Sequence, residues 1–152
     1  MTVAALIVAA GRGSRAGGGL PKQYRQIGGE AVLTRTIRAL LASDQIDLVR
    51  CVIHPDDEAL YQAAAPDDPR LAPPVHGGGE RATSVKLGLE ALAANAPACV
   101  LIHDGARPFV STGAIADIID ALGDHDGAVA ALPVVDALRR ADDGLCGAPI
   151  DR

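Results

Sequence analysis

The chain has 152 residues, of which 49% are hydrophobic, yet it contains no Trp, one Phe and two Tyr. This length suits one domain with a core of small aliphatic side chains. The formal net charge of −5 disfavours a nucleic-acid-binding surface, which is normally basic. No apolar run reaches the roughly 20 residues that span a bilayer. We therefore expect one domain over residues 1–152, with neither nucleic acid nor a membrane as its partner.

The three cysteines, Cys51, Cys99 and Cys146, are widely spaced and form no C-x-x-C pair. Two of them lie in apolar strand-like runs, which is typical of buried reduced thiols rather than of metal or redox sites. The amino terminus lacks the basic start of a secretory signal peptide. These features predict a cytoplasmic protein.

Apolar patterns predict strands and helices that alternate along the chain. Val3–Ala9 is almost continuously apolar, as expected for a strand buried on both faces, and further strands are expected over Leu48–Ile53, Ala98–His103 and Gly127–Val135. Residues with helical spacing predict helices around residues 33–41, 56–65, 85–92 and 112–122. We expect Val85, Leu89 and Leu92 to share the buried face of the third helix, and Ser111 or Thr112 to cap the fourth.

Two segments are expected to be irregular, because Pro66–Pro74 is rich in helix and strand breakers and Asp136–Arg152 is polar. The alternation of the other segments predicts an α/β fold with a mostly parallel sheet. In such sheets ligands bind at the carboxyl ends of the strands. Three unusual loops share that position, namely Ala9–Lys22, Gly77–Ser84 and Asp104–Arg107, and we expect them to form one site.

The first loop, "AAGRGSRAGGGLPKQ", is basic and rich in glycine in an otherwise acidic chain, with Arg12, Arg15, Lys22 and Arg25 preceding the first acid, Glu30. It is not a dinucleotide fingerprint, because Leu-Pro follows where a helix should begin, and no Gly-Lys-Ser/Thr marks a P-loop. The amides of Gly11 and Gly13 can instead face a small anion, with Arg15 and Lys22 reaching in from the two ends. The alternative is a mobile surface loop with solvated charges.

The other two loops each allow two interpretations. In "GGGERATS", Thr83 and Ser84 lie near a helix start and could cap it or bind a ligand. In "IHDGARP", Asp104 follows a strand and suits Mg²⁺, which takes one or two protein oxygens besides substrate phosphates; the alternative is an Asp–Arg pair that braces a turn. His103, like the other three histidines, is expected to be a packed side chain rather than a metal ligand.

The motifs "AAGRGSRAGGGLPKQY", "GGGERATSV" and "HDGARP", in this order and spacing, resemble the 2-C-methyl-D-erythritol 4-phosphate cytidylyltransferase family of the non-mevalonate isoprenoid pathway. The resemblance implies a Rossmann-like nucleotidyltransferase fold, a three-layer sandwich with a mostly parallel sheet. It also implies transfer of CMP from CTP to a polyol phosphate with Mg²⁺, and a homodimer joined by a protruding arm over residues 136–152. Ribitol-phosphate cytidylyltransferases share the motifs, and a nucleotide-binding module without catalysis is a further alternative.

The resemblance assigns roles to matching residues. Arg15 and Lys22 are implied to stabilise the transition state, and Asp104 to bind Mg²⁺. Arg107 and Arg152 are implied to position the polyol phosphate, the latter from the neighbouring subunit. The remaining residues are implied to bind the nucleotide, those of the second loop through the cytosine: Ala9, Ala10, Gly11, Gly13, Gly78, Arg81 and Ser84.

Two departures from the family pattern concern the acceptor and the carboxyl terminus. Ala137 stands where the family usually has a threonine near the polyol phosphate, so one hydrogen bond to the acceptor is in question. The family pattern also continues past Arg152, through a threonine-proline-glutamine segment and a substrate-binding lysine. Some members are fused to a cyclodiphosphate synthase, and the sequence leaves open whether this chain is the amino-terminal part of such a bifunctional protein.

Overall fold

The structure is a computed structural model that describes residues 1–12, 19–123 and 125–151. The expectations for Gly13, Arg15 and Arg152 therefore lie outside the described residues. At the centre is a four-stranded parallel sheet in the order β5-β4-β1-β6. Its strands are β1 (Val3–Ala9), β4 (Leu48–Ile53), β5 (Leu71–His76) and β6 (Cys99–Asp104).

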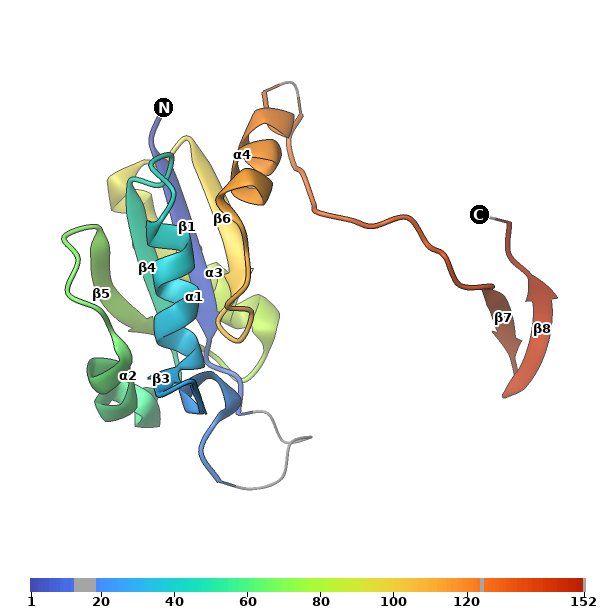
Figure 1. The fold of residues 1–152 in the computed structure, drawn as a ribbon, viewed down its shortest axis with the longest axis horizontal. Coiled ribbons are helices and arrows are strands. Elements are labelled where there is room, and N and C mark those ends of the chain that lie inside the picture. The colour runs from blue at the N-terminus through green and yellow to red at the C-terminus, as the bar shows by residue number, and fades with distance from the viewer. Residues whose placement is uncertain (13–18, 124, 152) are drawn as a thin grey trace.

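Helices cover both faces of this sheet (Figure 1). The helices are α1 (Val32–Leu41), α2 (Glu58–Ala64), α3 (Arg81–Leu92) and α4 (Thr112–Ala121). Short 3-10 turns are η2 (Lys22–Tyr24), η3 (Pro55–Asp57) and η4 (Ala93–Asn95), and β2 (Gln26–Ile27) pairs with β3 (Glu30–Ala31) in a small hairpin before α1.

Alternate residues of β1 enter two separate core clusters, one on each face of the sheet. Ala5 and Ile7 pack in the larger cluster with α1, α2 and α4. Ala4 and Leu6 pack in the smaller one with Leu92 of α3. The fold is thus a three-layer α/β sandwich with a parallel central sheet, as expected.

The buried face of α3 differs from the prediction. Ser84, Gly88 and Leu92 are its buried residues, whereas Leu89 is exposed. A Cβ added to Gly88 would lie 2.6 Å from a Leu6 methyl and 2.7 Å from one of Val52. The helix packs by bringing a glycine directly onto the sheet. The prediction is confirmed for Leu92, Val85 is half-buried, and Leu89 was wrongly assigned to the buried face.

The expected irregular segment Pro66–Pro74 ends earlier than predicted, because β5 begins at Leu71 and contains Pro73 and Pro74. These prolines are tolerated because β5 lies at the edge of the sheet. The strand expected over Gly127–Val135 is not formed. Its β-branched residues have no neighbouring strand: β6 is the edge strand of the described sheet, and Val129 and Val135 are exposed.

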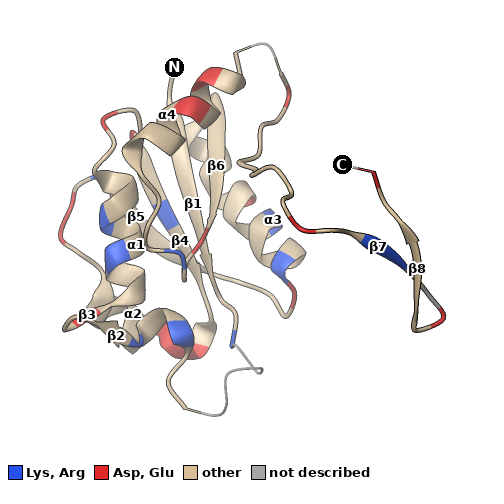
Figure 2. Ribbon diagram, turned by 45° about the vertical axis from the view of Figure 1, so that its right-hand side comes forward, with Lys and Arg blue, Asp and Glu red and all other residues tan. Residues whose placement is uncertain are grey.

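The segment after α4 runs away from the body and ends in a hairpin (Figure 1). Strands β7 (Arg139–Asp142) and β8 (Leu145–Pro149) pair antiparallel, so the prediction of irregular structure here was wrong. Asp143 and Gly144 connect them with φ of 48° and 79°, the two positive values that a tight type I′ turn requires. Figure 2 shows basic residues on β7 and acidic residues at the turn and at the two ends of this segment.

Candidate active site

The three loops meet at the carboxyl edge of the sheet because β1, β5 and β6 are parallel. The Gly77 amide donates to the Ile53 carbonyl oxygen over 2.8 Å, and the Gly105 amide donates to that of Val8 over 2.9 Å. The first bond places the second loop beside the end of β4, and the second bond places the third loop beside the end of β1. The expectation that the loops converge is confirmed for their described residues.

Glycine allows these loops to approach the end of β1 closely. A Cβ on Gly77 would lie 2.6 Å from the Ala10 Cβ, and a Cβ on Gly105 would lie 2.7 Å from the Ala9 Cβ. Neither distance is sterically possible without movement. Ala9 and Ala10, both implied to bind the nucleotide, are therefore enclosed by backbone from two neighbouring loops.

Asp104 joins the second loop to the third. Its Oδ1 accepts a hydrogen bond from Nη2 of Arg81 over 2.8 Å, and its Oδ2 lies 2.9 Å from Nε of Arg107. The hydrogen bond from Arg81 lowers the pKa of Asp104, and the two positive charges act in the same direction against the opposing effect of burial. Asp104 is thus a carboxylate at neutral pH, and the predicted Asp–Arg contact is present as well.

The donor set at Asp104 fits Mg²⁺. Mg²⁺ is usually held by one or two ionised carboxylates, because phosphate oxygens and water complete its coordination. Each carboxylate oxygen retains a second lone pair beside its arginine. In the part of the chain that the structure describes, no group of three or more His, Cys, Asp and Glu side chains could hold a metal by itself.

Ser84 is buried and contacts the backbone of the second loop. The Gly78 amide donates to Ser84 Oγ over 3.2 Å, and the same hydroxyl lies 3.3 Å from the Gly78 carbonyl oxygen. Ser84 therefore fixes Gly78, another of the three residues implied for the cytosine pocket. Arg81, by contrast, extends toward Asp104 rather than toward Gly78.

Lys22 and Arg107 line the same surface hollow of about 580 Å³. Lys22 is exposed at the start of η2, and Phe109 and Val110 also line the hollow. His103 Nε2 lies 2.9 Å from the Arg107 carbonyl oxygen, so this histidine contacts the third loop. The hollow places two of the cations expected to act on phosphates around one space.

The buried side chains that hold the loops were not found from the sequence. Gln23 is 2% exposed, and its Nε2 donates to the carbonyl oxygens of Ala9 and Gly11 over 2.7 and 3.1 Å. Thr36 in α1 is also buried, and its Oγ1 lies 3.1 Å from the Gly105 carbonyl oxygen. The sequence did contain one indication for Thr36, because it is a polar residue within the apolar face of a predicted helix.

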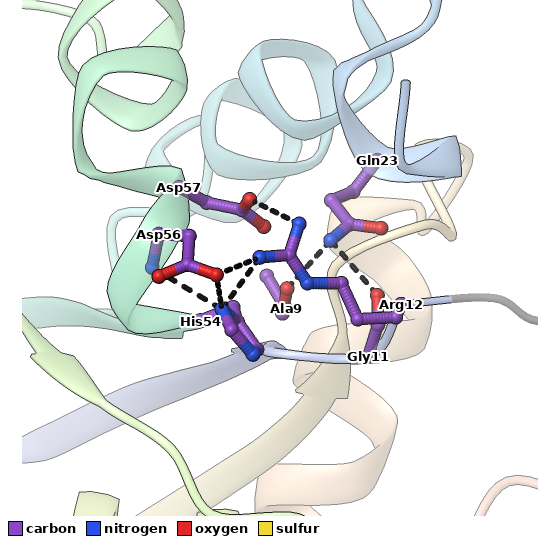
Figure 3. A network of polar contacts seen from close by, with 7 residues as sticks. All are labelled: Ala9, Gly11, Arg12, Gln23, His54, Asp56 and Asp57. Carbon is purple, nitrogen blue, oxygen red and sulfur yellow. Dashed lines mark hydrogen bonds and ion pairs between the residues drawn. The ribbon is translucent and has the colours of Figure 1, made fainter. Parts of the chain in front are cut away.

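Arg12 is paired with acids and is not free to bind an anion (Figure 3). Its Nη1 donates to Asp57 Oδ1 over 2.8 Å, and its Nη2 lies 2.9 Å from Asp56 Oδ2 and 2.7 Å from His54 Nδ1. Arg12 was counted among the basic residues that make the first loop positive, and this was wrong because acidic side chains already balance its charge. We call these four residues the Arg12 network.

The expectation of packed histidines was wrong for two of the four. His76 is exposed, with Nε2 3.5 Å from Glu58 Oε1, and His125 is exposed after α4. The cysteines agree with the prediction, since Cys51 and Cys99 are buried and free, while Cys146 is free and exposed. No helix in the described ranges is both long and apolar enough to cross a membrane.

A parallel sheet covered on both faces, with glycine loops, a carboxylate and cations at its carboxyl edge, is the architecture of α/β proteins that bind nucleotides. The sequence model of one such family, 2-C-methyl-D-erythritol 4-phosphate cytidylyltransferase, matches residues 3–152. The chain belongs to this family, and the resemblance drawn from its three motifs is confirmed.

Two curated relatives are bifunctional enzymes IspD/IspF. The protein from Rhodospirillum rubrum is 53% identical over 150 residues, covering 99% of this chain and 39% of the relative. The protein from Paramagnetospirillum magneticum is 50% identical over 147 residues, covering 97% of this chain and 38% of the relative. The chain thus spans about two fifths of the length of these relatives.

Solved structures of the family share the fold. The 4-diphosphocytidyl-2C-methyl-D-erythritol synthase of Anaerococcus prevotii matches with a TM-score of 0.80 at 28% identity, covering 99% of this chain and 64% of that chain. The 2-C-methyl-D-erythritol 4-phosphate cytidylyltransferase of Thermus thermophilus matches with a TM-score of 0.71 at 31% identity, with the same coverage of 99% and 64%.

Proposed function

We propose that this chain transfers CMP from CTP to 2-C-methyl-D-erythritol 4-phosphate, with release of pyrophosphate. The family match over residues 3–152 supports the activity. The observation that carries the proposal is the contact of Asp104 with Arg81 and Arg107, next to the enclosed end of β1. It brings a carboxylate and basic side chains to the position where the triphosphate of a bound nucleotide would lie.

The reaction needs no general base. A phosphate monoester has a second pKa of about 6, so the acceptor oxygen is already charged near neutral pH. The protein has to orient it in line with the α-phosphorus and offset the repulsion between two anions. Lys22 and Arg107 line one hollow and would act on the phosphates there. Arg15 would supply a further cation and, with Lys22, stabilise the departing pyrophosphate.

The backbone would carry much of the nucleotide binding. Ala9, Ala10, Gly11 and Gly13 would present amides to the triphosphate, an arrangement that binds anions in many glycine loops. Gly78, held by Ser84, would present fixed backbone groups to the cytosine, and Arg81 would link this loop to Asp104. A rigid backbone pattern that matches the cytosine amino group would reject uracil, because the mismatched groups would be left unpaired.

Asp104 would hold Mg²⁺, which polarises the phosphate oxygens and neutralises their charge when bound. Arg81 and Arg107 would keep the carboxylate ionised and correctly turned.

The assay is a matrix of nucleotides and acceptors with the full-length protein. CTP, UTP, ATP and GTP are each combined with 2-C-methyl-D-erythritol 4-phosphate or ribitol 5-phosphate, and pyrophosphate release and product mass are recorded. We expect one strongly preferred pair, CTP with the methylerythritol phosphate. Preference for ribitol phosphate, consistent with Ala137, would transfer the protein to the related polyol branch, and CTP binding without turnover would identify a binding module.

We also propose that residues 136–152 form the arm of a homodimer, with Arg152 completing the partner's site. Its hairpin lies away from the body, and Leu145 is exposed. The test mixes full-length Lys22→Ala and Arg152→Ala proteins under subunit exchange. Random pairing makes half the dimers mixed, each with one intact site, so activity should approach roughly a quarter of wild type. No gain over the separate variants, with exchange confirmed by native mass spectrometry, would refute the shared site.

A further inference from the structure

Arg12 connects the end of β1 to the turn that follows β4. The acids that it binds belong to η3 (Pro55–Asp57), forty residues and more away in the chain. Three separate groups hold one guanidinium: the Asp57 carboxylate at Nη1, and Asp56 and His54 at Nη2. Figure 3 shows the side chain lying between these groups and Gln23. A guanidinium bound on both of its terminal nitrogens has a fixed orientation.

The backbone on which Arg12 sits is held from a second direction. Gln23 in η2 donates to the carbonyl oxygens of Ala9 and Gly11. Residues 9–12 are therefore fixed between two neighbours, η2 through Gln23 and η3 through Arg12. A Cβ added to Gly11 would have no atom within 4 Å, so packing does little to restrain this position. The side chains of Gln23 and Arg12 are therefore what holds the backbone here.

The charge of Arg12 is already balanced. Asp57 is 1% exposed and its Oδ2 has no hydrogen-bond partner among the described residues, so this carboxylate depends on Arg12 for compensation. Arg12 itself is exposed, but removal of the partner of a buried carboxylate leaves an uncompensated charge and is destabilising. Because its charge is engaged in this way, Arg12 can affect a bound triphosphate through the position of the backbone and not as a free cation.

We propose that Arg12 is a positioning residue that sets the backbone of Ala9–Arg12 for the nucleotide. This inference rests on the proposed CMP transfer. The amides of this stretch would approach the triphosphate directly, so a displacement of their backbone changes both binding and the transition state. A displacement of about 1 Å is enough to lower kcat on the order of a hundredfold.

The test separates positioning from stability by means of a double substitution. Arg12→Met alone leaves the buried Asp57 carboxylate without its arginine partner, and should lower Tm strongly. Arg12→Met combined with Asp57→Asn removes the unpaired charge, and should recover most of the Tm while the anchor remains absent. In this double variant we expect kcat to stay about tenfold to a hundredfold below wild type, Kd for CTP to rise, and the amides of residues 9–12 to exchange faster.

Arg70 provides the matched control at the opposite side of the sheet, where the amino ends of the strands lie. It precedes β5, and its guanidinium donates to the carbonyl oxygens of Leu41, Ser43 and Ile46 over 2.6, 3.3 and 3.3 Å. Arg70→Met therefore also removes a multiply bound arginine, but far from the carboxyl edge. It should lower Tm while leaving kcat and the affinity for CTP unchanged.

Wild-type kcat and wild-type Kd for CTP in the folded double variant would overturn the inference. If the double variant does not fold, Arg12→Lys replaces it with the same readouts, because one ammonium retains the charge but cannot hold three partners on two nitrogens. If the wild-type protein does not transfer CMP, the proposed function fails. The rate of amide exchange at residues 9–12, compared between wild type and the Arg12 variants, then tests the anchoring role independently of activity. An unchanged exchange rate refutes that role.

Discussion

Gly105→Ala tests whether the contact between the third loop and the end of β1 sets the geometry of the site. The added Cβ would lie 2.7 Å from the Ala9 Cβ, 3.2 Å from its Cα and 3.3 Å from the Val8 carbonyl oxygen. Two of these three are backbone atoms, so no side-chain rotation can relieve the contact. The loop has to move until the methyl reaches an ordinary separation of 3.4–4 Å.

The cost has a stability part and a catalytic part. Overpacking by one methyl in a tight contact destabilises by about 1–3 kcal/mol, and each kcal/mol lowers Tm by about 2–4 °C in a domain of this size. Asp104, the adjacent residue, moves with the loop relative to Ala9. A movement of several tenths of an ångström at a site that works by orientation should lower kcat by about tenfold to a hundredfold.

Gly88→Ala is the matched control, because its added Cβ would meet a similarly close neighbour, a Leu6 methyl 2.6 Å away between α3 and the sheet. Both variants are assayed for CMP transfer at a temperature where each is fully folded by circular dichroism. We expect a similar fall in Tm for the two and a fall in kcat for Gly105→Ala alone. Equal kcat values at full folding would refute the idea that this contact sets the site.

Three further predictions concern single side chains. Lys22→Ala should lower kcat by about 10²–10³, as for loss of one preorganised charge-stabilising group, with Tm unchanged because the side chain is exposed; turnover within threefold of wild type would contradict its role. Asp104→Asn should raise the Mg²⁺ concentration needed for half-maximal activity, while Tm changes little because its arginine contacts are solvent-accessible and such pairs contribute at most about 1 kcal/mol. A large loss of Tm with normal Mg²⁺ dependence would favour a structural brace. A thiol reagent at pH 8 should modify Cys146 alone in the native protein, since burial raises the pKa of Cys51 to about 12 and also raises that of Cys99; rapid modification of two or more thiols would show an open core.

The fold could be predicted because its signals are local and strong. Val3–Ala9 and Leu48–Ile53 are apolar along their whole length, and the structure has β1 and β4 at these bounds. Ser111 caps α4, its side chain accepting from the Ala114 amide as expected. Alternation of such segments leaves few topologies other than a parallel sheet.

The sequence-based predictions were wrong where the structure of a segment depends on another segment that packs beside it. The apolar pattern of Gly127–Val135 predicts a strand, but a strand forms only beside another strand. The sequence pattern of one segment does not show whether a neighbouring strand is available. Within residues 136–152, the Asp143-Gly144 pair is a sequence signal for a tight turn between two strands, which the polar composition of the segment obscured. Gly88 is a third example: α3 packs closely against the sheet at this position because glycine has no side chain, and a search for large apolar residues does not detect such a contact.

The three loops share a feature that explains how glycine-rich segments can form a defined site. Glycine loses more conformational freedom on folding than other residues, so each loop needs support from outside itself. Gln23 supports the first loop, Ser84 the second and Thr36 the third, and all three are buried and bind loop backbone. Each hydrogen bond contributes about 1 kcal/mol, but leaving a carbonyl oxygen of the loop buried and unpaired would cost more. Two sets of residues therefore shape the loops: the glycines, which let the loops approach the end of β1, and the buried polar side chains, which hold the loop backbone in place.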